Sequence, residues 1–229
     1  MKKLAYKDIK ISHPDLFDNS NASIKIISDD DEISSWKKQK LTELKEQGNS
    51  PVWADVGVVL DDPRVVALRD LVEFPSGFRN GYIRLYNRAY LEGGAAAVVM
   101  LPEKDGNILL IQHFRHATRM HHWEIPRGFG MPGVNAETQA KNELREEIGG
   151  EVAELVDLGV FYNNTGLEGH PVNLFLAHLD SVGEMEVEEG IENSRWVSAA
   201  QLERMIADQE ITDGFTIVAY TRAKLKGRI

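Results

Sequence analysis

Three glutamates near the middle of the chain have the side-chain type and the spacing to bind a metal ion; they are Glu143, Glu146 and Glu147. If residues 136–148 form a helix with about 100° of rotation per residue, the three carboxylates share one arc of about 100°. The two basic residues of this segment fall outside that arc. Crowded carboxylates repel one another unless a cation lies between them, and oxygen ligands suit a hard divalent ion such as Mg²⁺ or Mn²⁺. The spacing therefore predicts a divalent-metal site on one face of this helix.

The elements that would position this face are a glycine-rich loop and the two ends of the helix. The loop covers residues 123–133, and its glycines let the backbone approach a bound metal. Asn135 can cap the first turn, and Gly149 followed by Gly150 provides a C-terminal stop. An apolar stripe lies beside the carboxylates and is expected to face the core; it consists of Ala140, Leu144 and Ile148.

The loop and the helix together resemble the signature of the Nudix hydrolases. That signature is a glycine, five residues, a glutamate, seven residues and then Arg-Glu-apolar-x-Glu-Glu-x-Gly-apolar; here it begins at Gly128 and continues through residues 143–149. The resemblance implies that the three glutamates bind divalent cations and that Glu147 is a catalytic residue. It also implies that the carbonyl oxygen of Arg127 is a backbone ligand.

The chain departs from this signature at three positions. Val134 stands where the family has its first glutamate, Asn142 where it has arginine, and Gly150 at the final apolar position. Replacing two charged partners together costs less free energy than leaving one of them unpaired. We therefore interpret Val134 and Asn142 as a structural ion pair that was lost as a unit, which leaves the metal-binding glutamates intact.

Composition limits the classes of function that the chain can have. It has 36 acidic and 26 basic residues among 229, a formal net charge of −10, and no cysteine. This balance argues against nonspecific binding to nucleic acid or anionic membranes, and the lack of cysteine excludes disulfides and thiolate catalysis. The N-terminus lacks the apolar core of a secretion signal, and no apolar run approaches about 18 residues. We expect a cytoplasmic protein that binds neither nucleic acid nor a membrane.

The pattern of the chain divides it into three predicted domains. Residues 1–50 are predicted as an N-terminal extension with a strand at 23–27 and a helix at 32–47. Residues 51–92 are predicted as a small antiparallel β domain, and residues 93–229 as a Nudix hydrolase domain. We expect the helix of the extension to serve packing or dimer contacts rather than catalysis.

The small β domain resembles the N-terminal sheet of the ADP-ribose pyrophosphatase branch of the Nudix family. Its strands are expected at residues 55–59, 65–72 and 82–86. The resemblance implies a homodimer and a contribution of this sheet to the substrate pocket. Arg84, on the third of these strands, is the substrate-binding candidate that it offers.

The Nudix domain is predicted to be an α/β/α sandwich around a mixed β-sheet, which makes the whole chain α+β. Ser198 and Asp213 can cap two helices near the C-terminus, at residues 199–207 and 214–224. The strands of the sandwich are expected at residues 95–101, 107–115, 155–162, 172–179 and 195–197.

Two segments next to the signature resemble substrate-binding motifs of the same branch. Residues 112–116 resemble its Gln-x-aromatic-Arg strand end, and residues 123–128 resemble its Glu-Leu-Pro-Ala-Gly motif. By this resemblance Arg115 faces phosphate or ribose, and Glu124 assists at the metal cluster. Judged from the residues alone, Arg115 could equally form a surface salt bridge.

The loop of residues 163–171 is a candidate to supply a catalytic base. In the pyrophosphatase branch this loop carries a glutamate that positions or deprotonates the attacking water. His170 fills that place here, and Glu168 lies two residues earlier. A neutral imidazole and a carboxylate both accept protons near pH 7, so both residues stay candidates. Further along the chain, Glu188 or Glu189 could make outer metal contacts.

These patterns indicate a metal-dependent enzyme. The metal site and the resemblance together imply a hydrolase that cleaves the pyrophosphate bond of a small-molecule nucleoside diphosphate derivative. ADP-ribose or a nucleotide sugar is the substrate that the resemblance implies. The main alternative is a noncatalytic nucleotide-binding Nudix protein whose signature has drifted, and a second is a Nudix enzyme that acts on capped nucleic acid or a coenzyme.

Overall fold

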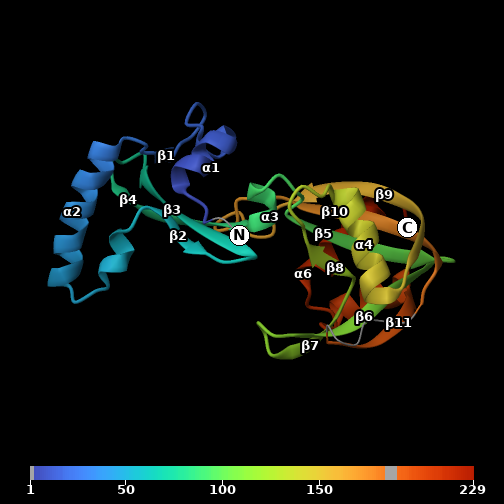
Figure 1. Ribbon diagram of the computed structural model, residues 1–229. Coiled ribbons are helices and arrows are strands. Elements are labelled where there is room, and N and C mark those ends of the chain that lie inside the picture. The colour runs from blue at the N-terminus through green and yellow to red at the C-terminus, as the bar shows by residue number, and fades with distance from the viewer. Residues whose placement is uncertain (1–2, 184–189) are drawn as a thin grey trace. The chain divides into compact units, whose positions relative to one another are not determined.

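The computed structural model describes residues 3–183 and 190–229, and it divides the chain into two compact units. The N-terminal unit comprises Met1–Leu91 together with Asn164–His170, and the C-terminal unit comprises Glu92–Asn163 together with Pro171–Ile229 (Figure 1). The C-terminal unit begins at Glu92, one residue before the expected start of the Nudix domain at residue 93. Residues 1–50 and 51–91, which the sequence separated into two domains, belong to one unit.

The N-terminal unit is built on a four-stranded antiparallel sheet. Its central strand is β3, which pairs with each of the three others. The strands are β1 (Lys25–Ile26), β2 (Gly57–Asp61), β3 (Val65–Glu73) and β4 (Arg79–Asn87). Because β1 comes from the predicted extension and completes this sheet, the extension does not form a separate domain.

Three α-helices and two short 3-10 helices accompany this sheet. Asp29 caps the longest helix by accepting hydrogen bonds from two backbone N–H groups, so that helix begins two residues before the predicted start. Ile9, on the first helix, is buried against Val66 and Tyr86 of the sheet. The helices are α1 (Tyr6–Ser12), α2 (Asp30–Glu46), α3 (Arg88–Leu91) and the 3-10 helices Pro14–Phe17 and Pro51–Ala54.

The segment Asn164–His170 belongs to the N-terminal unit because its backbone pairs with β4. The N–H of Leu85 donates to the carbonyl of Leu167 (2.8 Å), and the N–H of Gly169 donates to the carbonyl of Leu85 (3.0 Å). Glycine is needed at position 169, since a Cβ there would lie 2.5 Å from the ring of Tyr86.

The C-terminal unit is built on a seven-stranded mixed sheet. Five strands follow the order β11-β6-β5-β10-β9, with β7 paired to β6 and β8 paired to β5. The pairing of β10 with β5 is parallel and the others are antiparallel. The strands are β5 (Ala97–Lys104), β6 (Asn107–Arg115), β7 (Met120–Glu124), β8 (Arg127–Phe129), β9 (Glu151–Phe161), β10 (Val172–Ser181) and β11 (Ile191–Ser198).

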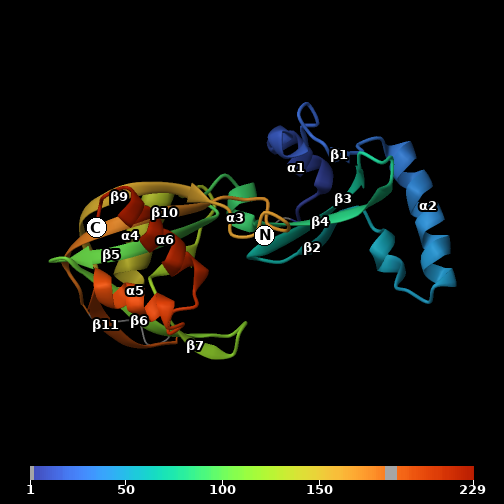
Figure 2. The ribbon, with the colours of Figure 1, turned by 180° about the vertical axis from the view of Figure 1, so that it is seen from behind.

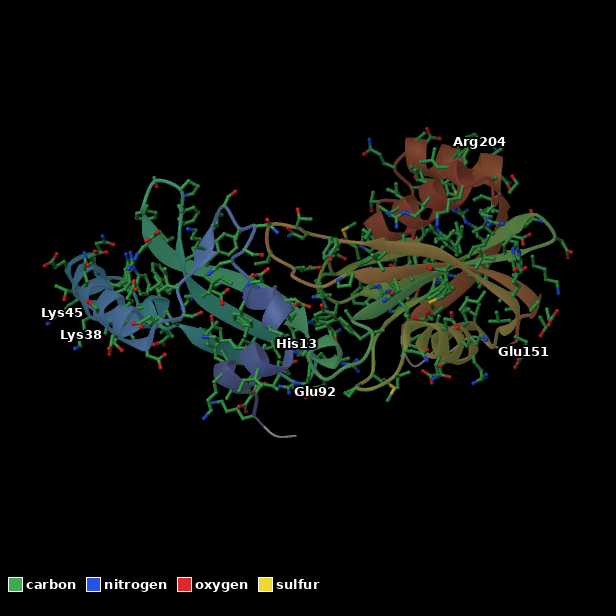
Figure 3. The ribbon with its side chains drawn as sticks, turned by 90° about the horizontal axis from the view of Figure 1, so that it is seen from above. His13, Lys38, Lys45, Glu92, Glu151 and Arg204 are labelled. Atoms are coloured by element: carbon green, nitrogen blue, oxygen red, sulfur yellow. The ribbon has the colours of Figure 1, made fainter. Side chains whose placement is uncertain are left out.

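Helices cover both faces of this sheet. In Figures 1 and 2, α4 (Ala136–Ile148) lies on one face, and α5 (Ala199–Ala207) and α6 (Gly214–Leu225) lie on the other. Figure 3 shows these layers edge-on, with the sheet between α4 and the pair formed by α5 and α6. Successive side chains of β5 point to opposite faces of the sheet, so the core has two parts. Val98 packs on the side of α4, and Val99 packs on the side of α5 and α6. The predicted α+β class and α/β/α sandwich are confirmed.

Local signals in the sequence set the ends of the helices. The side chain of Asn135 accepts from the N–H of Thr138 (2.9 Å), and Gly149 adopts the left-handed conformation with φ of 57°, so α4 has its predicted limits. Ser198 and Gln201 form a capping box at the start of α5. None of the helices in residues 3–183 and 190–229 combines the length and apolar character that a membrane-spanning helix needs.

Candidate active site

The candidate site lies where β5 and β6 separate. These strands pair with each other only next to their connecting turn, and beyond it β8 pairs with β5 while β7 pairs with β6. A cavity of about 270 Å³ lies against β5 and β8. Its wall combines the backbone of these two strands with two arginines, Arg115 and Arg127, and two phenylalanines, Phe129 and Phe215.

Glu147 lies on the buried face of α4 and faces the backbone of β8. Its side chain is 2% exposed, and its Oε2 accepts a hydrogen bond from the N–H of Arg127 (3.1 Å). The N–H of Met100 on β5 donates to the carbonyl of Pro126 (3.0 Å), so the next residue, Arg127, turns its N–H and its carbonyl away from β5. The carbonyl oxygen of Arg127 therefore points to the same side as the Glu147 carboxylate.

Glu143 lies against the next residue of the same strand, Gly128. A Cβ on Gly128 would lie 1.9 Å from Cδ of Glu143, so the carboxylate occupies the space that a side chain would take. The side-chain amide of Gln139 donates to Oε1 of Glu143 (2.6 Å) and to the carbonyl of Phe129 (3.1 Å). The two glutamates thus contact adjacent residues of β8.

Glu146, the third predicted ligand, lies on the exposed face of α4. Within residues 3–183 and 190–229, no three acidic or histidine side chains already converge as a metal cluster. Like charges separate and turn to hydrogen-bond donors when no cation lies between them, which accounts for the contacts of Glu143 and Glu147 with amide groups. The predicted contacts through Glu188 or Glu189 fall outside the described residues.

The donor set on this face fits a divalent cation. It offers two carboxylates and a backbone carbonyl, which are the oxygen ligands that Mg²⁺ and Mn²⁺ prefer. The absence of a side chain at Gly128 leaves the Glu143 carboxylate directly against the backbone. Glu143, Glu147 and the carbonyl of Arg127 are the groups that would hold the ion, with Glu146 next to them in sequence.

Arg115 is bound to a fully buried carboxylate rather than to a surface acid. Glu124 is buried, and its carboxylate accepts from Nε of Arg115 (3.2 Å), from Nη2 of Arg115 and from Nη2 of Arg127 (3.3 Å). Burying a carboxylate costs free energy unless it is paired and hydrogen-bonded, and these contacts provide both. The structure therefore gives Glu124 two guanidinium groups as partners, whereas the sequence suggested a role at the metal cluster.

The side chain of Arg127 contributes to the site, whereas the sequence suggested a role only for its backbone carbonyl. Its guanidinium group lies 4.4 Å from the ring centroid of Phe215 and 3.4 Å from the carboxylate of Asp213. The available signal was the arginine that stands where the resembled motif has alanine. Phe215 is the second residue of α6, the helix that Asp213 caps.

Arg84, the predicted substrate-binding residue of the small β domain, is engaged inside the N-terminal unit. Its Nε donates to Asp70 (2.6 Å), and its Nη1 donates to the carbonyl of Leu16 and the hydroxyl of Tyr86 (both 2.8 Å). Burial raises the pKa of Tyr86 to about 12, so this hydroxyl stays neutral. These contacts give Arg84 a structural role in the unit.

The two candidate bases, Glu168 and His170, both lie in the segment that pairs with β4. Nδ1 of His170 accepts from the backbone N–H of Asn87 (3.3 Å), and its ring lies near those of Tyr86 and Tyr90. Burial lowers the pKa of His170, although the nearby charge of Glu168 opposes this shift. In a neutral imidazole whose Nδ1 accepts, Nε2 carries the proton. His170 therefore has its acceptor nitrogen already engaged.

The lowered pKa of His170 predicts a pH-dependent stability. Above its ordinary value of 6.5, His170 is neutral in both the folded and the unfolded chain, so it adds no pH dependence. As the pH falls through that value, the unfolded chain takes up a proton that the folded chain does not, and the free energy of unfolding decreases until the folded pKa is reached. Thermal unfolding of wild type and His170→Asn between about pH 7 and pH 5 should show a smaller decrease for the variant. Equal slopes would contradict this assignment.

Gly128→Ala should displace Glu143, because the new Cβ would overlap its carboxylate. We expect the affinity for Mn²⁺ to fall by roughly 10- to 100-fold, while the protein stays folded because the carboxylate can rotate aside. Titration of Mn²⁺ followed by electron paramagnetic resonance measures the affinity. Gly214→Ala is a control, since a Cβ at position 214 meets no atom within 4 Å in the described structure. Unchanged Mn²⁺ affinity in Gly128→Ala would contradict the placement of Glu143 in the site.

Comparison with known proteins identifies the family. Residues 92–215 match the family model described as NUDIX domain. The chain is 26% identical over 159 residues to an ADP-ribose pyrophosphatase of Bacillus subtilis (strain 168). This match covers 68% of this chain and 82% of the relative. The chain is 29% identical over 156 residues to an ADP-ribose pyrophosphatase of Mycobacterium tuberculosis (strain ATCC 25618 / H37Rv), covering 65% and 71%.

A solved structure supports the fold. The crystal structure of an ADP compounds hydrolase superposes with a TM-score of 0.62 at 21% identity, over 76% of this chain and 95% of that one. At this identity the likeness bears on the fold alone. The family model spans more than half of the chain and includes the loop, β8 and α4, which carry the candidate ligands. The chain belongs to the Nudix family.

Proposed function

We propose that this protein is a Nudix hydrolase that depends on a divalent cation, most simply Mg²⁺, and cleaves the pyrophosphate bond of ADP-ribose or a nucleotide sugar. The substrate class is supported by the two relatives, both of which are ADP-ribose pyrophosphatases. A bound divalent cation supplies charge neutralisation at the phosphates and lowers the pKa of a bound water.

The observation that carries this proposal is the buried carboxylate of Glu147 against the backbone of β8. Burying a carboxylate is costly, and the Glu147 carboxylate is buried where its Oε2 meets the N–H of Arg127, next to the glycine of β8 that Glu143 lies against. The cost is explained if Glu147, Glu143 and the carbonyl of Arg127 form an oxygen site for a cation.

The charges of the neighbouring cavity also favour metal assistance. Arg115 and Arg127 each pair with acids, since Glu124 contacts both and Asp213 contacts Arg127. These pairs leave the cavity wall close to neutral, so its arginines alone offer little net positive charge to a diphosphate. We propose that Arg115 and Arg127 orient the phosphate or ribose through directional hydrogen bonds, and that Phe215 provides an apolar surface beside them.

We propose Glu168 rather than His170 as the residue that positions or deprotonates the attacking water. A base needs a free lone pair, and the acceptor nitrogen of His170 is engaged by the N–H of Asn87. A carboxylate offers about four lone-pair sites, so Glu168 can accept hydrogen bonds and still accept a proton from water. In this proposal His170 orders the segment that carries Glu168.

We also propose a homodimer. The N-terminal unit exposes large apolar side chains, with Trp53 at 54% and Phe78 at 60%, and burial in a contact between two copies would remove them from water. Sedimentation velocity tests this, and a monomer at micromolar concentration would contradict it. A cytoplasmic location remains a proposal from composition.

A noncatalytic nucleotide-binding protein is the second candidate. It is favoured by one observation, which is that the described acidic side chains do not already converge as a metal cluster. Incubation with ADP-ribose, nucleotide sugars and dinucleoside diphosphates in the presence of Mg²⁺ separates the two candidates, with Glu147→Gln as the control. We expect turnover of ADP-ribose or a nucleotide sugar by the wild type. No turnover of any member, together with tight binding that needs no Mg²⁺, would establish the noncatalytic function instead.

A further inference from the structure

Gln139 links the glycine-rich loop to a predicted metal ligand. It lies on α4, one turn before Glu143, and only 3% of its side chain is exposed. Its Nε2 donates to Oε1 of Glu143 (2.6 Å) and to the carbonyl of Phe129 (3.1 Å). Both contacts are to acceptors, which fixes the orientation of the amide, because an oxygen in that place would face two other oxygens.

Stability alone does not explain a glutamine at this position. Its Oε1 is buried, and within the described part of the chain no donor reaches it. A buried acceptor without a hydrogen bond costs free energy that an apolar side chain of the same size would not. Since both bonds of the amide run to the loop and to Glu143, the benefit that offsets this cost is to be sought at those two partners.

The departures from the Nudix signature indicate what that benefit is. Val134, in the loop, and Asn142, on the helix, are neutral where the signature has charged residues. An ion pair between charged residues at these positions would tie the loop to the helix, and the neutral residues present here cannot form one. The amide of Gln139 ties the same two segments without adding a net charge beside the carboxylates.

We propose that Gln139 is a positioning residue that holds the Glu143 carboxylate against the loop in the orientation needed to bind a divalent cation. The inference rests on the proposed metal site, and it assigns to Gln139 the tether that the pair at positions 134 and 142 no longer provides. A fixed carboxylate loses less conformational entropy when it binds an ion, so the tether should contribute to affinity rather than to folding.

The test is Gln139→Met, which keeps the length of the side chain and removes both donors. We expect the affinity for Mn²⁺, measured by electron paramagnetic resonance, to fall by about 10- to 100-fold. We expect the melting temperature of the metal-free protein to stay the same or rise. Amide hydrogen exchange in residues 128–134 of the metal-free protein should become faster, because the loop loses its bond to the helix. Gln139→Leu repeats the test if the first variant does not fold.

A matched control exists on another helix. Gln39 donates to Glu43 on α2 with the same spacing of four residues, in an exposed position (3.3 Å). Gln39→Met should therefore leave Mn²⁺ affinity unchanged. Adding Val134→Glu and Asn142→Arg to Gln139→Met should recover much of the lost affinity, whereas the same pair in the wild type should change stability more than affinity.

The outcomes separate this inference from the proposed function. If Glu143→Gln weakens Mn²⁺ binding but Gln139→Met and Gln139→Leu do not, the positioning role is wrong and the metal site stands. If Glu143→Gln also binds Mn²⁺ like the wild type, the metal site itself is wrong. If the Gln139 variants lose affinity and unfold at correspondingly lower temperature, Gln139 is a structural residue only.

Discussion

Replacing Glu147 by glutamine should lower kcat for the diphosphate substrate by about 10²- to 10³-fold in the presence of Mg²⁺. The substitution removes the negative charge of the most buried of the three glutamates and keeps its shape. The glutamine oxygen can still accept the hydrogen bond from the N–H of Arg127, so the helix and β8 should stay in register. Initial rates at saturating Mg²⁺ measure the effect.

Two controls make this result specific. Glu146→Gln removes the same charge from an exposed position on the same helix and should have a smaller effect. Thermal unfolding of the metal-free Glu147→Gln protein should occur at or above the wild-type temperature, because a buried charge has been removed. A variant with wild-type kcat would exclude Glu147 from the site.

Glu168→Gln should lower kcat by about 10²- to 10⁴-fold, which is the range expected for the loss of a general base. His170→Asn should lower it less than about 10-fold, since the asparagine oxygen can still accept from the N–H of Asn87. The difference follows from the engaged acceptor of His170. Single-turnover rates with preformed metal complex measure the chemical step for both variants.

The comparison of the two variants tests this assignment. If His170→Asn instead abolishes activity while Glu168→Gln retains it, the roles are reversed. If neither variant affects the chemical step, the segment Asn164–His170 supplies no base.

Elements with local signals were predictable from the sequence. The limits of α4 follow from Asn135 and Gly149, and α5 begins where Ser198 can cap it. The strand at residues 107–115 was predicted with its observed limits because a tight turn precedes it. In each case, the residues that decide the structure lie within a few positions of the element itself.

Features that depend on distant partners were not predictable. The strands β7 and β8 form because β5 and β6 separate and leave edges that these two segments pair with. The separation of β5 and β6 cannot be read from the residues of β7 and β8 themselves. Two arginines donate hydrogen bonds to Glu124, and Gln139 donates to Glu143 and to the carbonyl of Phe129. Both sets of contacts depend on residues that only folding brings together. A polar residue at a helix position that faces the core was the available signal for Gln139, and the periodicity of α4 could have revealed it.

The pairing of Asn164–His170 with β4 means that the chain enters the N-terminal unit twice. A fragment trimmed to residues 92–229 would keep this segment but lose Leu85, whose N–H and carbonyl satisfy it. Expression of residues 92–229 alone would therefore not yield a minimal enzyme. The backbone groups of Asn164–His170 that pair with β4 would be left without their partners and exposed to water. Chimeras that exchange the N-terminal unit between relatives would need to exchange this heptapeptide with it.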